Sequence, residues 1–250
     1  MKRDLKSVEN FINLNKGNLI VLESSPNIAL STFSLNMATN LALKLNSAVA
    51  IFSMEMSKEQ LVNRMISSEA MVDIEKIRTL KVEDEDWTKL SKTMKYMSEA
   101  NIYIDDTMEI LITEIEDKCK KLKSEKNIKL IIIDYLQLVR KSDKNKVNSE
   151  QEILEIYKAL KTLTEELDVP VILLSKPSNL RNEPTSLKLY KGNKAEQDIA
   201  MFMFLDNSNI KTTDLENIVE INIFKNNNDN IEKINIGYIP KYCKFVELKN

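Results

Sequence analysis

The chain has 250 residues, of which 43% are hydrophobic and 30% charged, as is typical of a soluble globular protein with a full core. Its 36 Lys and Arg residues against 38 Asp and Glu residues give a net charge of −2, so nucleic-acid binding would need a local basic patch. Apolar runs fall short of the roughly 18 residues of a membrane span. No apolar segment follows the charged residues 1–6, so we expect a cytoplasmic protein without membrane association.

Cysteine and glycine usage narrows the chemistry further. The two cysteines, Cys119 and Cys243, lie far apart in a chain without histidine, which predicts reduced, unpaired thiols and no Cys/His zinc site. Only three glycines are present, where average usage is about 7%. Few positions are therefore available for a glycine-rich loop around phosphates.

The N-terminal part of the chain predicts a strand, a loop and a helix. A short amphipathic lead-in at residues 1–16 precedes an apolar run at 19–22, which is typical of a buried strand. Apolar residues then recur at about every fourth position across 33–45. We expect a helix there, with Ser31 or Thr32 as its N-cap.

The middle of the chain continues this alternation. Ser57 opens a mostly helical stretch up to residue 99, with Glu59 and Gln60 in the first turn. An acidic run at 83–86 is interpreted as carboxylates at a helix N-terminus, favoured by the helix dipole, rather than as a metal site. The remaining predicted elements are strands at 48–52, 102–106, 130–134 and 169–174 and helices at 112–126 and 150–167.

After residue 200 the pattern changes to successive strands separated by polar turns. These strands are predicted at 201–205, 218–224, 231–237 and 242–248. They suit antiparallel hairpins added at the edge of a sheet that the preceding strand–helix alternation makes mainly parallel. With no internal repeat and no interdomain linker, we expect one α/β domain over residues 1–250.

The connection between the first strand and the first helix occupies the place of a phosphate-binding loop. Such a loop reads G-x-x-x-x-G-K-S/T, because glycine lets backbone N–H groups surround phosphates, lysine reaches the β/γ oxygens and the hydroxyl holds Mg²⁺. Here Ala29 stands at the second glycine, Leu30 at the lysine and Ser31 at the hydroxyl. The candidate loop consists of Ser24, Ser25, Pro26, Asn27, Ile28, Ala29, Leu30, Ser31 and Thr32.

Two acidic residues follow predicted strands that neighbour this loop. Asp134 ends the most apolar strand, where a P-loop enzyme keeps the carboxylate that holds Mg²⁺. Glu55 follows the second strand, where it could activate water. Because the carboxyl ends of parallel strands converge on one crevice, these positions predict a nucleotide site together with the loop. An ordinary tight β–α connection that never held phosphate is the alternative.

Motifs spread over nearly the whole chain carry a resemblance to one known family. The most specific are Asp134-Tyr135-Leu136-Gln137 and the segment ending in Ile104-Asp105-Asp106. The other matching segments are 51–56, 83–87, 101–103, 132–133, 138, 169–175 and 196–198. Together they resemble the C-terminal, RecA-like ATPase domain of DnaB-type replicative DNA helicases. The resemblance implies a RecA-like P-loop NTPase fold, in which a mainly parallel twisted sheet is flanked by helices and extended by antiparallel strands at the C-terminal end.

The chain departs from this family where the chemistry would take place. Ala29 and Leu30 replace the glycine and lysine, Lys176 replaces a glutamine that resembles a γ-phosphate sensor, and Asn227 replaces an arginine that reaches the neighbouring subunit, although Lys225 is kept. A lysine–phosphate contact is worth roughly 1.5–3 kcal/mol. An arginine finger is worth about 10³–10⁵ in rate. We therefore expect no ATP hydrolysis from this degenerate Walker A loop, with Glu55 and Asp134 vestigial.

Two basic loops resemble the DNA-contacting channel loops of the family. Lysine and arginine near a phosphate backbone would give salt-dependent binding without sequence preference, whereas the alternative is two solvated loops in a lysine-rich chain. The candidate contacts are Arg140, Lys141, Lys144, Lys146, Arg181, Lys188, Lys191 and Lys194. The chain also begins where the family's motor domain begins, without a linker helix or collar domain, so a hexameric ring is not expected.

The sequence thus predicts a stand-alone pseudoenzyme that acts as a DNA-replication accessory module on a replicative helicase, another replication protein or single-stranded DNA. No cofactor and no metal are expected. One alternative is an active ATP-dependent DNA helicase with an unorthodox loop, which would need ATP and Mg²⁺. Another is a structural subunit that binds a nucleotide without hydrolysing it.

Overall fold

A computed structural model describes residues 17–26, 28–140, 150–176, 198–206, 217–225 and 228–248, so the predicted lead-in at 1–16 lies outside the described residues. The strands are β1 (Leu19–Ser24), β2 (Val49–Ser53), β3 (Ile102–Asp105), β4 (Leu130–Asp134), β5 (Val171–Leu174), β6 (Met201–Asp206), β7 (Asn217–Lys225), β8 (Asn228–Ile239) and β9 (Lys244–Glu247). The helices are α2 (Leu30–Lys44), α3 (Lys58–Ala70), α4 (Ile74–Thr79), α5 (Asp84–Met97), α6 (Ile112–Lys126) and α7 (Glu150–Leu167), with the short 3₁₀ turns η1 (Leu136–Leu138) and η2 (Pro240–Tyr242).

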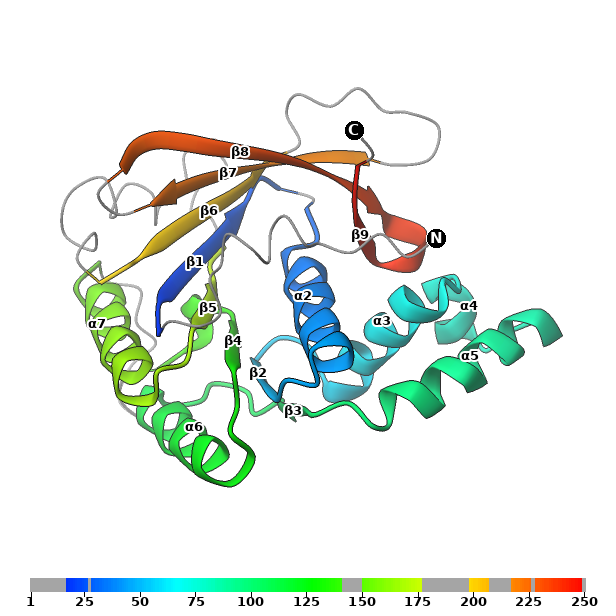
Figure 1. The fold of residues 1–250 in the computed structure, drawn as a ribbon, viewed down its shortest axis with the longest axis horizontal. Helices are drawn as coiled ribbons and strands as arrows, with labels where there is room; N and C mark the ends of the chain where they lie inside the picture. The colour runs from blue at the N-terminus through cyan, green and yellow to red at the C-terminus, as the bar shows by residue number, and fades with distance from the viewer. Residues whose placement is uncertain are drawn as a thin grey trace.

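The described strands form a nine-stranded sheet in the order β3-β2-β4-β5-β1-β6-β7-β8-β9. Pairing is parallel from β3 through β6 and antiparallel from β6 to β9, as Figure 1 shows. The predicted mainly parallel α/β sheet with antiparallel C-terminal strands is confirmed. Strand β6 joins the two parts, because it pairs with β1 in parallel and with β7 in antiparallel.

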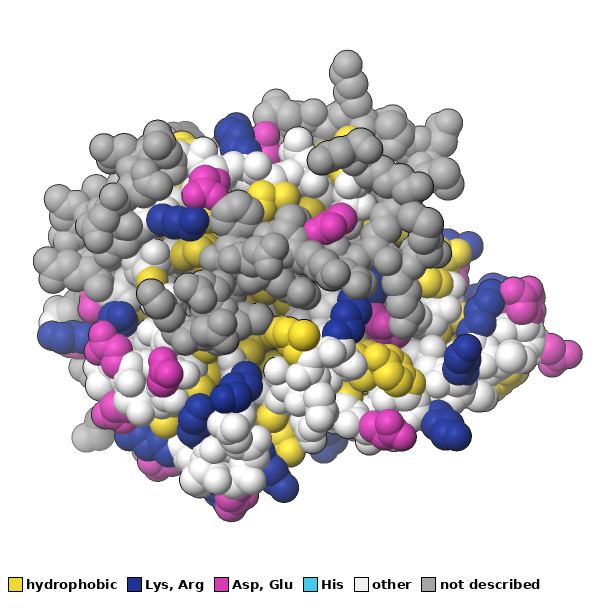
Figure 2. All heavy atoms as spheres, in the orientation of Figure 1, with side chains coloured by type: hydrophobic (Ala, Val, Ile, Leu, Met, Phe, Trp, Pro, Cys, Tyr) yellow, Lys and Arg dark blue, Asp and Glu magenta, His cyan; other side chains and the backbone are white. Residues whose placement is uncertain are grey.

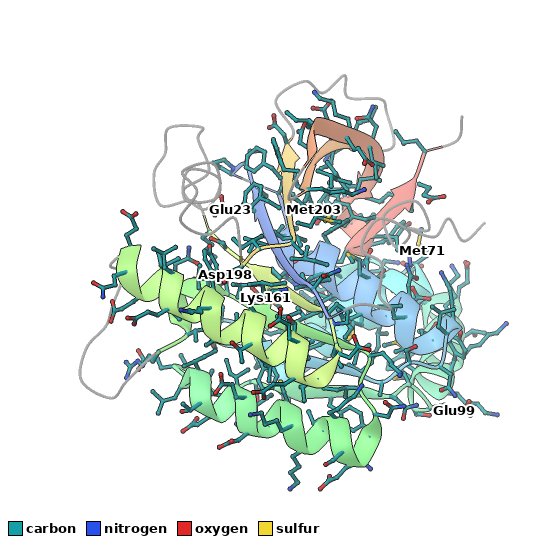
Figure 3. The ribbon with its side chains drawn as sticks, turned by 60° about the vertical axis from the view of Figure 1, so that its left-hand side comes forward. Glu23, Met71, Glu99, Lys161, Asp198 and Met203 are labelled. Carbon is teal, nitrogen blue, oxygen red and sulfur yellow. The ribbon has the colours of Figure 1, made fainter. Side chains whose placement is uncertain are left out.

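Helices cover both faces of the parallel part of the sheet. Along β1, Ile20 and Leu22 face a core shared with α2 and α3, whereas Leu19 and Val21 face a second core shared with α6 and α7. Figures 1 and 3 show α6 and α7 side by side on one face and α2 on the other. Two-sided burial explains why these strands are continuous apolar runs rather than alternating ones.

The predicted helical stretch up to residue 99 is divided into α3, α4 and α5, which extend to one side of the sheet (Figure 1). Ser57 caps α3 in a capping box with Gln60, so that prediction is confirmed. The acidic residues 83–86 lie at the start of α5, where Asp86 is 2.7 Å from the Nζ atom of Lys76. This position agrees with their interpretation as a helix N-terminus.

The predicted cap of the first helix is wrong. Helix α2 begins at Leu30, and its N-cap residue, Ala29, makes no side-chain capping hydrogen bond. The hydroxyls of Ser31 and Thr32 are engaged elsewhere, with Asp134 and Arg64 respectively. These partners come from distant strands and helices, so a local rule could not anticipate them.

Both cysteines are free, as the sequence predicted, and the structure shows that both are buried. Burial raises the pKa of the Cys119 thiol to about 12, with the nearby Glu116 charge adding to the effect. None of the described helices is long and apolar enough to cross a membrane.

Candidate functional site

The candidate site lies where β1, β4 and β5 end and α2 begins. A cavity of about 170 Å³ opens there, and it brings together residues that are far apart in the sequence. Its lining consists of Ser24, Ile28, Ala29, Leu30, Ser31, Arg64, Asp134, Tyr135, Leu174, Ser175 and Lys176. An adjoining cavity of about 530 Å³ shares Ala29, Ser31 and Arg64 with it and also includes Glu55. The predicted loop and both predicted acids therefore lie around one hollow region.

The loop turns back on itself at Ala29. The N–H of Leu30 donates to the carbonyl of Ile28 at 2.9 Å, and Ala29 has φ −76° and ψ 71°, which is the geometry of an inverse γ-turn. The N–H of Ile28 donates to the carbonyl of Ser25 at 3.4 Å. Two of the loop amides are thus directed at the loop itself. Because φ is negative, alanine adopts this turn without the strain expected at a glycine position.

Two apolar side chains hold this connection against the core, one from the loop and one from the first residue of α2. Ile28 and Leu30 are partly buried and pack against the core that α2 shares with the sheet. A lysine at position 30 would have to withdraw its charged end from this core. Leu30 therefore packs against the core on one side and adds an apolar surface to the cavity on the other.

Asp134 lies at the end of β4 and is only 4% exposed. Burial raises the pKa of its carboxyl group, while a hydrogen bond with the Ser31 side chain opposes the shift. The charge of Glu55 acts in the same direction as burial, and the charges of Lys176 and Arg64 oppose it. Ser31 and Asp134, which stand where a P-loop enzyme keeps its two Mg²⁺ contacts, are thus hydrogen-bonded to each other.

Glu55, which lines the larger cavity, and Lys176, which lines the smaller one, form an ion pair. The Nζ atom of Lys176 lies 2.7 Å from each carboxylate oxygen of Glu55 and 4.0 Å from the centre of the Tyr135 ring. Burial acts to lower the pKa of Lys176, but its hydrogen bond with Glu55 and the charge of that residue outweigh burial, so the pKa is raised. The side chain at the sensor position is therefore a cation bound to the acid that could activate water.

A chain of hydrogen bonds runs beneath this ion pair. The amide of Gln137 donates to the Ser175 hydroxyl at 3.1 Å and to the Lys176 carbonyl at 2.8 Å, and its oxygen accepts from the Lys176 N–H at 3.2 Å. Ser175 in turn donates to Glu23 at 2.7 Å. Glu23 is fully buried at the loop end of β1, and Figure 3 labels it there. These bonds fix the backbone after β5 to the segment after β4.

The candidate DNA contacts are mostly beyond what the structure describes. Arg140 is described and forms an ion pair with Glu109. The other candidates, Lys141, Lys144, Lys146, Arg181, Lys188, Lys191 and Lys194, lie outside the described residues. In the described part of the face shown in Figure 2, basic and acidic side chains are interspersed rather than gathered into one basic surface.

The remaining predicted positions are Lys225, Asn27 and Asn227. Lys225, at the end of β7, lies 2.9 Å from Glu232 of β8, whereas Asn27 and Asn227 lie outside the described residues.

Among the described residues, no group of three or more His, Cys, Asp or Glu side chains could hold a metal ion.

Sequence reasoning missed Arg64 as a component of the site. Its side chain comes from α3, lines both cavities and donates to the Thr32 hydroxyl at 3.2 Å. It is an ordinary basic residue on an amphipathic helix in the sequence, with no local motif to mark it. The sequence has no lysine or arginine between residues 17 and 43, the segment around the loop, so no cation was expected from the loop itself. Arg64 and Lys176 reach the loop from elsewhere in the fold.

The strand order, the strand–loop–helix connection and an acid at the end of β4 define the RecA-like class of P-loop NTPase folds. The sequence profile of the DnaB-like helicase C-terminal domain matches residues 2–247. The chain therefore belongs to the DnaB-like helicase C-terminal domain family.

Known helicases support this membership. The chain is 40% identical over 241 residues to the replicative DNA helicase DnaB of Geobacillus stearothermophilus, covering 94% of this chain and 53% of the relative. It is 39% identical over 241 residues to the replicative DNA helicase DnaC of Bacillus subtilis, with the same coverage of 94% and 53%. The chain thus spans about half the length of the curated relatives it matches.

Solved structures agree with the sequence comparison. A DnaB-like replicative helicase, solved in a study of its interactions with primase, superposes with a TM-score of 0.81 at 28% identity, covering 94% of this chain and 58% of that one. A solved ATPase domain gives the same TM-score and identity over 94% of this chain and 86% of that one. A KaiC-like protein from Pyrococcus horikoshii, with a TM-score of 0.59, 17% identity and coverage of 94% and 90%, shares the fold. The predicted RecA-like helicase domain is confirmed.

Proposed function

We propose that this DnaB-like domain does not hydrolyse ATP and acts as a binding module in DNA replication. The observation that carries the proposal is the loop region, in which the partly buried Leu30 packs against the core and its N–H donates to the Ile28 carbonyl. A phosphate-binding loop needs a lysine and free backbone N–H groups at these positions. The residues present do not fit the phosphates of ATP in that way.

The acids around the loop support the same proposal. The carboxyl group of Asp134 is hydrogen-bonded to Ser31, and that of Glu55 forms an ion pair with Lys176. A lysine–phosphate contact is worth roughly 1.5–3 kcal/mol, and none is available from within the loop. Asn227 also replaces the family arginine that reaches the neighbouring subunit. An arginine of that kind raises the rate of hydrolysis about 10³–10⁵-fold, and the chain has none at this position.

A second candidate is a subunit that binds a nucleotide without hydrolysing it. It is favoured by Arg64 and Lys176, two cations that line the cavity beside the loop. Their charges could attract phosphates to this cavity. Against this, both side chains already have partners, Thr32 and Glu55 respectively.

An ATPase and binding assay separates these candidates from an active helicase. We expect no steady-state hydrolysis by the purified chain with ATP and Mg²⁺, with or without single-stranded DNA, and no change on Asp134→Ala. Turnover that Asp134→Ala abolishes would overturn the proposal in favour of an active enzyme. Tight ATP binding without turnover would favour the second candidate, and Arg64→Ala should then weaken it.

The proposed partner is a replicative helicase or another replication protein, because the curated relatives are replicative helicases and one similar structure concerns a helicase with primase. Single-stranded DNA is the second candidate partner. Co-purification with a replicative helicase at micromolar concentrations should show association, and its failure would contradict the helicase as partner. Binding to single-stranded DNA should weaken steeply with salt if phosphate contacts carry it.

A further inference from the structure

The ion pair between Glu55 and Lys176 connects parts of the sheet that are not adjacent. Glu55 follows β2 and Lys176 follows β5, and β4 lies between these two strands. Tyr135, which follows β4, lies beneath the ammonium group with its ring centre 4.0 Å from Nζ. One lysine side chain at the end of β5 therefore contacts groups at the ends of two other strands, β2 and β4.

The backbone at Lys176 is held as well as its side chain. Both its N–H and its carbonyl bond to the side chain of Gln137, at 3.2 Å and 2.8 Å. Gln137 lies in η1, directly after β4. The chain that leaves β5 is thus attached to the end of β4 by its backbone and to the end of β2 by its side chain.

We propose that this group of Glu55, Tyr135 and Lys176 is an internal replacement for a bound nucleotide, and that it holds the ends of β2, β4 and β5 together without any ligand. The inference rests on the proposed function, because a site that binds and hydrolyses ATP would have to release Glu55 in each cycle. In the resemblance to DnaB-type helicases, position 176 is a glutamine. A neutral amide could donate only an uncharged hydrogen bond to Glu55, so the charge-assisted connection depends on Lys176.

The strength of the connection follows from its exposure. The side chains of Lys176 and Glu55 are 50% and 46% exposed, so water screens the pair. Exposed ion pairs measure about 0.2–1 kcal/mol, which corresponds to a roughly 1.4- to five-fold change in a local opening equilibrium. The connection therefore biases local opening and leaves global stability nearly unchanged.

Amide hydrogen exchange on the full chain tests the proposal. In Lys176→Gln and in Glu55→Gln we expect roughly 1.4- to five-fold faster exchange in peptides covering 53–57, 134–138 and 171–176. The reversed pair, Glu55→Lys with Lys176→Glu, should restore exchange more fully than either reversal alone. Lys233→Gln is a matched control, because it removes the ion pair in which the Nζ atom of Lys233 in β8 lies 3.0 Å from Glu220 in β7. This variant should leave the exchange rates of the three peptides unchanged.

Adding ATP and Mg²⁺ completes the test. The proposal expects unchanged exchange in the wild-type peptides, because the connection is already made. It is overturned if ATP slows exchange there, if the single variants exchange like the wild type, or if the reversed pair is as fast as the single reversals. ATP hydrolysis by the wild type would contradict the proposed function and is measured separately, so the two failures are distinguishable.

Discussion

The buried ion pair between Lys244 of β9 and Glu69 of α3 attaches the C-terminal strands to the helix that carries Arg64. The Nζ atom of Lys244 lies 2.6 Å from Glu69, and the two side chains are 9% and 4% exposed. Removing one partner of a buried pair costs about 3–5 kcal/mol, because the remaining charge loses its compensation. We expect Lys244→Met, which keeps the apolar stem, to lower the free energy of unfolding by about this amount.

Urea unfolding followed by circular dichroism measures the loss, and calorimetry should show a fall of roughly 6–20 °C in Tm for a chain of this size. Replacing both partners, Lys244→Met with Glu69→Leu, should recover most of the loss, since apolar replacements of buried pairs are often neutral. Lys241→Met is the control, because the Lys241 side chain is 58% exposed and its Nζ atom lies 3.9 Å from Asp73. A loss below about 1 kcal/mol for Lys244→Met, with an unchanged m value, would refute the reasoning.

Two further predictions concern titratable groups. Burial raises the pKa of the Asp134 carboxyl group above its ordinary value of 3.8. The folded chain therefore binds a proton at Asp134 more readily than the unfolded chain does. As the pH rises from about 4 through the raised pKa, ionisation of Asp134 lowers the free energy of unfolding. Asp134→Asn should therefore gain stability relative to wild type as the pH rises above about 4 in urea titrations, and a pH-independent difference would contradict this. Cys119 and Cys243 are buried, so a thiol reagent at about pH 8 should react only after unfolding, and rapid modification of the native chain would refute their burial.

The periodicity of apolar residues predicted the elements of the described fold closely. The runs at 130–134 and 171–174 are apolar without alternation, as required of strands covered on both faces. The change to successive strands after residue 200 predicted the antiparallel edge. Where boundaries moved, as at the start of α2, side-chain partners distant in sequence were responsible.

The candidate site could be predicted in position but not in its interactions. Because parallel strands end at one edge, Glu55 and Asp134 were expected near the loop, and they lie there. Their partners could not be predicted, since Lys176 is 121 residues from Glu55 and no local pattern joins them. The same holds for Arg64, which α3 carries to Thr32 across 32 residues.

The sequence by itself determined the family, the fold and the absence of glycine and lysine at positions 29 and 30, because these are properties of residue type and spacing. Only the tertiary structure decided what the altered positions do. It gives Ala29 an inverse γ-turn, packs the partly buried Leu30 against the core and pairs Lys176 with Glu55. Side-chain contacts of this kind depend on how strands and helices meet in space, which residue order alone does not specify.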